Sequence, residues 1–372
     1  MPKSILRRSL SLLPSTVRTK ADLTYLSLAD TLEKWRLPMF RVTGTVADDS
    51  QNRAAIVYFG ELPQFGEWTS AILGEACSPE LVQVVTLPQV LLRKIPGPNA
   101  DLMLFPVNPL TERLFLRRGW RIVPVYVSSV IRLNDSLEAA LRANAKRDRR
   151  LFRKLGLKLV LLKKESDFEE FYTSMLVPTI TKRHGVNAHI SDYSSLRKVF
   201  ERGWLLGCYE GNEWLVGRLL APEGPHRVLA ANVGWRHGEE EILRRHIVPA
   251  SLYGVIEWAA TQGFHFFNLG SSSPFVNDGV LNYKLRYNVR LELPQITYED
   301  GILEGARGFV GAHYNLASES GREILHRSPV IEKRAGGPGV IAWRSETPKT
   351  FQPLVEKGLP WLDLAEVRQM NG

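Results

Sequence analysis

The chain has 372 residues, of which 44% are hydrophobic and 23% are charged, a composition typical of soluble globular proteins with room for two domains. No apolar run approaches the roughly 18 residues that a membrane-spanning helix needs, which excludes a helical membrane protein. Basic residues exceed acidic ones by nine, and this balance favours an anionic partner. The two cysteines, Cys77 and Cys208, form no CxxC pair, so we expect neither a disulfide framework nor a zinc site.

The first 20 residues hold five basic side chains and no acidic one. Their apolar stretch, Leu10 to Leu13, is too short for a secretory signal, and Pro14 interrupts it. We therefore expect a loosely docked basic segment that can contact an anionic membrane surface peripherally. The protein is expected to be cytoplasmic, or peripheral to the inner membrane, with no transmembrane segment.

Residues 21–133 alternate between helical and extended patterns, which indicates a mixed α/β layer. Helices are expected at 22–36 and 109–118, with a loop at 95–101. Runs rich in β-branched and aromatic residues predict four strands, at 54–60, 81–87, 101–106 and 120–133.

Residues 134–158 carry the strongest helical pattern. Asp135 and Glu138 have the spacing of a capping box, and Gly156 is a plausible end. From Arg142 to Lys158 there are eight basic residues and one acid, Asp148. The basic run is either a solvated helix face or a face that touches phosphates, and the spacing leaves both open.

The following elements have a distinctive order: three consecutive antiparallel strands, a long helix, a strand and another helix. Gly211-Asn212 is a hairpin turn, and Pro249 is expected to kink the long helix. A turn from Gly270 to Pro274 precedes the last helix, which opens at Gly279. The expected elements are strands at 158–164, 204–210, 213–222, 227–235, 264–269 and 290–298, helices at 166–183, 241–262 and 305–328, and a loop at 335–340.

Four segments in this order resemble the acyltransferase domain of the GNAT superfamily, in its Fem-like (FemAB) branch. They are LEAALRANAKRDRRLFRKLGLKL, FYTSMLVPTITKRHG, WLLGCYEGNEWLVGRLL and, most specifically, HIVPASLYGVIEWAATQGFHFFNLGSSSPFVNDGVLNYKLRYN. The run LHRSPVIEKRAGGPGVIAW is similar to the C-terminal tail of such proteins.

The resemblance implies a mixed α/β (α+β) fold with a GNAT-like central sheet, flanking helices and two GNAT-like halves. The expected domains are a basic segment (1–20), a degenerate GNAT-like half (21–133), an acyltransferase domain (134–300) and a helical and irregular tail (301–372).

The resemblance also implies transfer of an acyl group from acyl-CoA, including acetyl-CoA, or an acyl carrier to an amino or hydroxyl group. The acceptor would be a sugar, an amino acid or a cell-envelope or polysaccharide precursor. Aminoacyl-tRNA is the alternative donor, and a non-catalytic scaffold on the same fold is a third possibility. No metal is expected.

Direct attack needs donors for the oxyanion and a base for the acceptor's proton. The candidate bases are Glu257, Asp278 and His246, of which Asp278 also suits a turn or helix cap. The resemblance places Lys284 and Arg183 near substrate phosphates, although both could be surface cations. The full set of expected binding residues is Arg183, Gly270, Ser271, Ser272, Tyr283, Lys284, Arg244 and Arg245.

One segment departs from the family. GNAT acetyltransferases hold the coenzyme A pyrophosphate on a glycine-rich loop before the long helix. Here that segment is WRHGEEEILRR (235–245), with one glycine and three consecutive glutamates. Because like charges repel, the glutamates disfavour a pyrophosphate there, and Arg244 and Arg245 are the residues that could compensate.

Overall fold

The computed structural model describes most of the chain between residues 35 and 343 and a few positions outside that range. The expected capping box at Asp135 and Glu138, the loop at 95–101 and the basic segment at 1–20 lie largely or wholly outside the described residues. The described positions are 27–28, 31, 35–47, 51–60, 65–74, 78–92, 100–133, 143–184, 190–294, 297–299, 302–304, 308–343, 354, 359 and 361–363.

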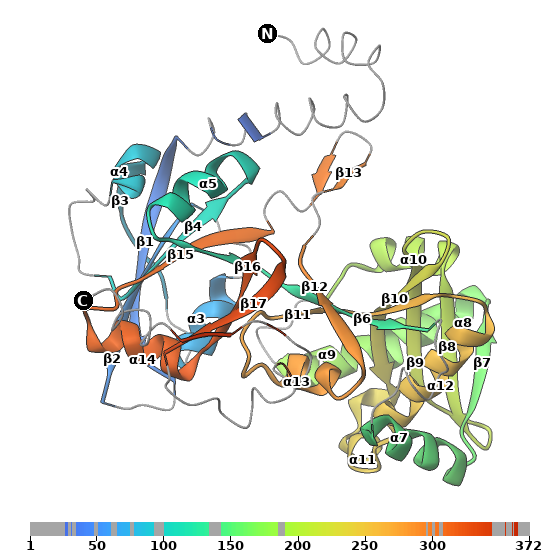
Figure 1. Ribbon diagram of the computed structural model, residues 1–372. Coiled ribbons are helices and arrows are strands. Elements are labelled where there is room, and N and C mark those ends of the chain that lie inside the picture. The colour runs from blue at the N-terminus through green and yellow to red at the C-terminus, as the bar shows by residue number, and fades with distance from the viewer. Residues whose placement is uncertain are drawn as a thin grey trace, which may run out of the picture. The chain divides into compact units, whose positions relative to one another are not determined.

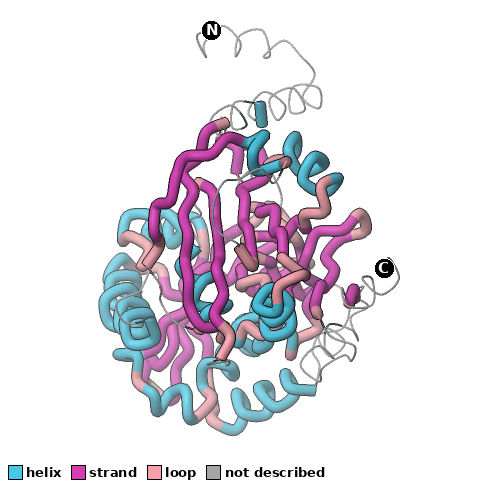
Figure 2. Tube along the Cα trace, turned by 90° about the vertical axis from the view of Figure 1, so that its left-hand side faces the viewer, coloured by secondary structure: helices cyan, strands magenta, loops and turns pink. Residues whose placement is uncertain are grey.

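The chain forms two compact units, and each is built from separate stretches of sequence. Unit 1 comprises Met1–Val127, Ser273–Leu281 and Glu292–Gly372, and unit 2 comprises Ser128–Ser272 and Asn282–Leu291. These boundaries differ from the expected ones because residues after 300 return to unit 1. The strands and helices of both units can be followed in Figures 1 and 2.

Unit 1 contains a six-stranded mixed sheet. Its strand order is β3 (Glu80–Thr86), β1 (Arg36–Thr45), β2 (Arg53–Phe59), β4 (Leu102–Val107), β15 (Phe309–Tyr314) and β5 (Arg121–Pro124). Only β2 and β4 pair in parallel among the described pairs of this sheet. Helices α3 (Phe65–Leu73), α4 (Leu87–Leu91), α5 (Pro109–Arg117) and α14 (Glu319–Arg327) accompany the sheet.

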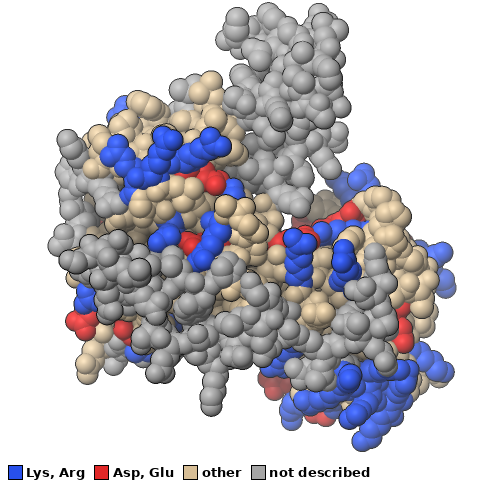
Figure 3. Space-filling model, viewed as in Figure 1, with Lys and Arg blue, Asp and Glu red and all other residues tan. Residues whose placement is uncertain are grey.

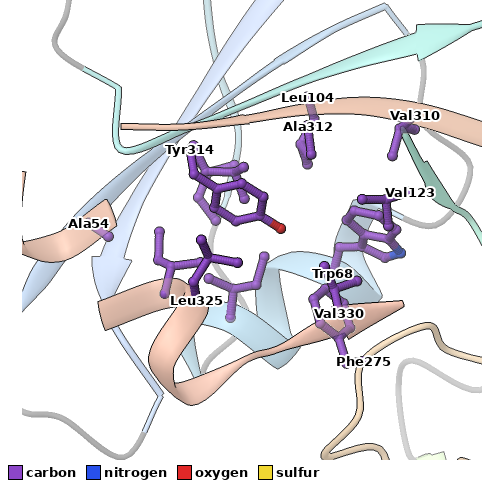
Figure 4. Packing of buried hydrophobic residues seen from close by; sticks show 14 of the residues in the cluster. Ala54, Trp68, Leu104, Val123, Phe275, Val310, Ala312, Tyr314, Leu325 and Val330 are labelled. Carbon is purple, nitrogen blue, oxygen red and sulfur yellow. The ribbon is translucent and has the colours of Figure 1, made fainter. Parts of the chain in front are cut away.

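Aromatic and aliphatic side chains form the core of unit 1. Trp68 of α3 meets Phe275 edge-on, with ring centroids 5.2 Å apart, and Tyr314 and Leu325 lie in the same cluster (Figure 4). Burial of these side chains supplies the main driving force for this unit, at about 25 cal/mol for each Å² of apolar surface removed from water.

Two predictions for the end of the chain are wrong. The helix expected at 305–328 is instead β15 followed by α14, because Ser318 caps α14 by accepting a hydrogen bond from the Gly321 N–H (2.9 Å). The loop expected at 335–340 is a hairpin of β16 (Val330–Arg334) and β17 (Gly337–Ala342), to which β18 (Trp361–Asp363) adds a parallel strand. Gly337, at a φ of 128°, supplies the turn conformation that glycine tolerates.

Unit 2 contains a seven-stranded mixed sheet. Its strand order is β12 (Val289–Glu292), β6 (Val127–Arg132), β11 (Phe266–Ser272), β10 (Arg227–Trp235), β9 (Glu213–Pro222), β8 (Trp204–Glu210) and β7 (Lys158–Leu162). Strands β7 to β10 form an antiparallel meander, and β11 then joins β10 in parallel. The three antiparallel strands β8 to β10 and the strand β11 that follows them along the chain agree with the sequence prediction, and the predicted mixed α/β class is confirmed.

Helices pack on both faces of this sheet. On one face, α8 (Glu165–Glu170), the π-helix η1 (Phe171–Leu176), α9 (Val177–His184) and α10 (Tyr193–Arg202) enclose a cluster that includes Phe168, Phe171 and Leu219. On the other face, α7 (Ala143–Lys154), α11 (Glu240–Arg244) and α12 (Ile247–Thr261) cover Cys208 and Val216. Within the described residues, no helix is both long and apolar enough to cross a membrane.

The single helix expected at 241–262 is two helices, and the break is at His246 rather than at Pro249. His246 has a φ of 57°, in the left-handed region that non-glycine residues rarely occupy. Pro249 falls in the first turn of α12, where its missing N–H costs no helical hydrogen bond. The predicted strand 264–269 extends further, because β11 continues through Gly270, Ser271 and Ser272.

Candidate active site

A break in the sheet of unit 2 marks the candidate site. Strands β10 and β11 pair in parallel only from Arg227–Phe266 to Leu229–Asn268. The register of β10 with β9 shifts between Ala230 and Asn232, which places a bulge where the parallel pairing ends. Beyond Leu229, the described residues show no strand pairing of β10 with β11. Bulges of this kind are enriched next to active sites.

The exposure of β10 residues indicates an opening in the sheet where the parallel pairing ends. Residues 230–233 of β10 are partly exposed, although the strand lies in the middle of a seven-stranded sheet. The neighbouring strand β9 is buried from Trp214 to Leu220. Ligands in open α/β sheets bind beyond the carboxyl ends of parallel strands, and residues 230–233 have that position relative to the parallel pair.

The far end of β10 is closed by η1 and α9. The Trp235 N–H donates a hydrogen bond to Thr179 Oγ1 (3.0 Å), and a Cβ added to Gly234 would lie 2.6 Å from the Leu176 nitrogen. Arg183, expected to bind substrate phosphates, is exposed and lies over the Trp235 ring at 5.8 Å. The opening is therefore confined to 230–233.

Lys284 of α13 (Gly279–Leu285) fixes the end of β11. Its ammonium donates hydrogen bonds to the Gly270 carbonyl (2.9 Å) and the Ser271 carbonyl (2.7 Å), and the residue is only 7% exposed. Lys284 is thus a buried cation, not a surface lysine. Gly270 has a φ of 81°, and its N–H donates to Asn268 Oδ1 (2.9 Å). That N–H is therefore engaged by a side chain of the same strand.

The other two residues at this end of β11 differ in exposure. Ser271 is exposed, whereas Ser272 is buried, and its hydroxyl has no hydrogen-bond partner in the described part of the chain.

A chain of hydroxyl groups links α13 to α7. The Tyr287 hydroxyl donates to Asp148 Oδ2 (2.9 Å), and the Tyr283 and Tyr287 hydroxyl oxygens are 3.4 Å apart. Because the one proton of Tyr287 points at Asp148, Tyr283 has to donate to Tyr287. The Tyr283 oxygen keeps lone pairs that can accept a proton from a substrate.

Burial shifts the pKa of every member of this chain upward. Desolvation raises the pKa of the Asp148 carboxyl, and the Tyr287 hydrogen bond and the Arg147 charge oppose that rise only in part. Desolvation also raises the pKa of Tyr283 and that of Tyr287. Both phenols are therefore neutral near pH 7, and Asp148 is the group best placed to accept a proton.

Arg218 of β9 lies beside this chain of hydroxyls. It is paired with Val233 of β10, level with the opening, and it is 6% exposed. Its Nε donates to Ser251 Oγ (3.0 Å) and its Nη2 to the Val248 carbonyl (2.7 Å), both on α12. Desolvation lowers the pKa of Arg218, and the side chains that act on its charge are Tyr283, Tyr287 and Cys208.

The expected bases have other environments. Glu257 accepts a hydrogen bond from the Tyr253 hydroxyl (2.9 Å) on α12, and burial together with this contact raises the pKa of Tyr253 to about 12. His246 lies close enough to Asp148 for its charge to lower the pKa of that carboxyl. Asp278 belongs to unit 1 and accepts the Leu281 N–H (2.6 Å), as a helix cap does.

The segment that corresponds to the pyrophosphate loop of GNAT acetyltransferases, residues 235–245, offers no free cation for a pyrophosphate. Arg245 donates to both carboxylate oxygens of Glu210 (2.6 and 2.7 Å), and Arg244 is exposed and lies 3.7 Å from Glu241. Neither arginine is left to offset Glu239, Glu240 and Glu241. A phosphate-bearing donor would have to be held elsewhere.

Basic side chains do gather on α7. Figure 3 shows Lys and Arg concentrated at the α7 end of unit 2. The exposed members include Lys146, Arg147, Arg150, Arg153 and Lys154. Among the residues that the structure describes, no group of three or more His, Cys, Asp or Glu could hold a metal ion.

The sequence interpretation missed Arg218, Ser251 and the role of Asp148. Two signals were present: Arg218 is the one charged residue inside the apolar strand LVGRLLA, and Asp148 is the one acid in a basic helix. A single charged residue in an apolar strand, or a single acid in a basic helix, is unusual enough to indicate a buried polar group.

No protein-family model matches the chain, and no curated protein matches it. Among solved structures, it is similar to the C-terminal domain of a protein described as a lysylphosphatidylglycerol synthetase from Agrobacterium fabrum (10% identity, TM-score 0.38, 77% of this chain and 84% of that one). It is also similar to FemX (12%, 0.37, 71% and 88%) and to a GCN5-related N-acetyltransferase from Sphaerobacter thermophilus (16%, 0.32, 70% and 72%).

These solved structures include the GNAT-type and Fem-like proteins that the sequence resemblance names. At this level of identity and TM-score, the likeness decides neither the activity nor the donor nor the acceptor.

Proposed function

We propose that unit 2 is an acyltransferase domain that moves an acyl group to an amine or hydroxyl by direct attack. The observation that carries the proposal is the partly exposed stretch 230–233, which follows the parallel pairing of β10 with β11 and, among the described strand pairs, pairs only with β9. Backbone N–H groups on the side of this stretch that faces away from β9 can hold the acyl carbonyl and stabilise the oxyanion that develops there.

The acceptor's proton would leave through the chain of hydroxyls. Tyr283 accepts it while passing its own proton to Tyr287, and Tyr287 passes a proton to Asp148. This sequence leaves both phenols neutral and protonates one carboxylate. As the new bond to the acyl carbon forms, the bond from that carbon to the donor's sulfur or oxygen breaks, and the leaving thiolate or alkoxide takes up the proton that Asp148 has accepted, so the charges balance. A positioned base of this kind contributes about 10²–10⁴-fold to a rate.

The donor would be an acyl-CoA or an acyl carrier, and the acceptor an amino group of a sugar, amino acid or envelope precursor. Aminoacyl-tRNA is the second candidate donor, and one observation favours it. The phosphate-binding segment of coenzyme A enzymes is occupied here by glutamates and by arginines with acidic neighbours, whereas α7 offers a broad basic surface suited to a polyanion.

Transfer from radiolabelled acetyl-CoA, longer acyl-CoA and bulk aminoacyl-tRNA to a mixed panel of amines tests the proposal. We expect turnover with one donor class and a loss of about 10²-fold or more in the Tyr287→Phe variant. Tyr172→Phe, whose hydroxyl donates only to the Ser191 carbonyl (3.3 Å), is the matched control and should keep the wild-type rate. No turnover and no binding with any donor would instead favour a scaffold.

The salt dependence of binding separates the two donors. Lys146, Arg150 and Lys154 stand four residues apart on α7 and are exposed. Changing all three to glutamine should reduce the log–log salt slope for tRNA binding by about 3, because each phosphate contact contributes about one unit. An unchanged slope would remove α7 from the donor site.

A further inference from the structure

Arg218 is a buried cation with no counter-ion within the described residues. It is 6% exposed, and neither its hydrogen bonds nor its ion pairs involve a carboxylate. Ordinary buried arginines are paired, because removing an isolated charge from water costs several kcal/mol. Arg236 of the same unit is a surface arginine that does have a carboxylate partner, since its Nη1 lies 2.6 Å from Glu213 Oε1.

The groups around Arg218 do not supply the missing charge. Burial raises the pKa of Cys208 to about 12 and keeps the thiol neutral, and the Tyr283 and Tyr287 phenols are neutral as well. The nearest acid in this network, Asp148, is engaged by Tyr287. Arg218 is therefore the buried cation of this network without a carboxylate partner among the described residues, whereas the charges of Arg147 and Arg286 act on Asp148.

The guanidinium also has an unused edge. Nε and Nη2 are fixed to α12, which sets the plane of the group, while Nη1 makes no hydrogen bond to any residue that the structure describes. The Tyr283 hydroxyl oxygen, with its free lone pairs, lies in the same network and is the terminus of the proton path.

We propose that Arg218 binds a carboxylate carried by the acyl acceptor, so that the acceptor is an amine that bears a carboxylate, of the amino-acid class. This assignment rests on the proposed transferase function of unit 2. One uncompensated cation matches a monoanion such as a carboxylate, because a phosphate dianion would need a second free cation and Lys284 is bound to two backbone carbonyls. The acceptor's amine would then lie within reach of Tyr283.

Binding of small probes tests the carboxylate site without any assay of transfer. Thermal shift and calorimetry would compare N-acetyl-L-alanine, its neutral amide N-acetyl-L-alaninamide, and inorganic phosphate. We expect stabilisation by the carboxylate, and an affinity at least 10-fold weaker for the amide. Stronger stabilisation by phosphate than by the carboxylate would overturn the choice of ligand, and equal binding of the acid and the amide would overturn the site.

Substitution of Arg218 supplies the second arm. Arg218→Met removes the charge together with its hydrogen bonds to Ser251 and Val248, so the variant should lose the carboxylate shift measured against its own melting temperature without ligand. Arg236→Met, which breaks an existing ion pair, should keep that shift. Arg218→Lys retains the charge but lacks the planar guanidinium, so we expect it to bind the carboxylate at least 10-fold more weakly. This variant also tests the site if the Arg218→Met protein does not fold. Carboxylate binding that survives in both Arg218 variants would refute the proposal.

The two proposals fail separately. Carboxylate binding without acyl transfer from any donor would leave the Arg218 site standing and remove the transferase function. Acyl transfer to amines that carry no carboxylate, at the same rate as to those that do, would leave the transferase and remove the Arg218 site.

Discussion

Asp148 is the residue whose surroundings differ most from what its sequence context suggests. It lies in a basic helix, yet burial outweighs the neighbouring charges and raises the pKa of its carboxyl. A carboxyl with a folded-state pKa above its unfolded value contributes stability at low pH. That contribution is lost as the pH rises through the folded-state pKa.

Asp148→Asn should therefore stabilise the protein increasingly as the pH rises above about 4, the usual pKa of an aspartate. The amide oxygen can still accept the Tyr287 hydroxyl, so the geometry is retained while the buried charge is removed. Transfer should fall together with this gain in stability, because the proton acceptor is gone. Thermal melting from pH 3 to 8 measures the effect, because the difference between the two proteins changes between the unfolded-state and folded-state pKa and is constant above the latter. A melting-temperature difference that does not change with pH would contradict the assigned pKa direction.

Lys284 holds the end of β11 through two backbone carbonyls. Lys284→Ala should lower the free energy of unfolding by about 2 kcal/mol, because it removes the two charge-assisted hydrogen bonds of a buried ammonium to the Gly270 and Ser271 carbonyls. Lys182→Ala on the exposed side of α9 is the control and should change stability by less than about 0.5 kcal/mol. Urea denaturation measures both. Equal values for the two variants would show that Lys284 does not fix β11.

At the scale of elements, the close approach of η1 to β10 confines the opening. A methyl group at position 234 would lie 2.6 Å from the Leu176 nitrogen and 2.7 Å from the Met175 carbonyl carbon, both backbone atoms that cannot yield cheaply. Gly279, at the first position of α13, has nothing within 4 Å of its added Cβ.

Gly234→Ala should cost about 2 kcal/mol or more of stability, whereas Gly279→Ala should be neutral or stabilise by up to about 1 kcal/mol. Chemical denaturation of the two variants decides the point. A Gly234→Ala variant as stable as the wild type would mean that η1 does not close the far end of β10.

The strands and helices that were predicted correctly are those whose signal is local. The hairpin β8–β9 follows from Gly211-Asn212 between two apolar runs, and α5 follows from Asn108 and Pro109 at its start. The helix expected at 305–328 was wrong because β15 is stabilised by β4 and β5, strands some 200 residues earlier in the chain. No local pattern contains that information.

The same reason limits prediction of the site. Lys284 and Tyr283 could be named as candidates from the sequence because they lie in its most specific motif. Arg218, Asp148 and Ser251 come from three separate elements, and only the folded sheet places them near α13. The opening at residues 230–233 results from how β10 pairs with its neighbouring strands. The sequence of β10 alone does not indicate it.

At the scale of the whole molecule, the chain enters unit 1, builds unit 2 and returns. β15 lies between β4 and β5, so the last part of the chain completes the sheet of unit 1. A variant comprising residues 1–301 lacks β15 and α14 but keeps every strand of the unit 2 sheet.

In that variant we expect cleavage by chymotrypsin to concentrate in residues 36–127, because β4 and β5 lose the strand that joins them. Unit 2 should yield the more resistant fragments. Mass spectrometry of a limited digest reads out both regions. A truncated chain with wild-type resistance throughout residues 36–127 would show that β15 is dispensable to unit 1.

The central claim is that residues 230–233 of β10 form the open edge that receives the acyl donor. Hydrogen–deuterium exchange of this stretch, with and without each donor, tests it most directly. We predict that one donor class slows amide exchange at 230–233 and leaves the tip of the β8–β9 hairpin unchanged. Unaltered exchange at 230–233 with a donor that demonstrably binds would contradict the claim.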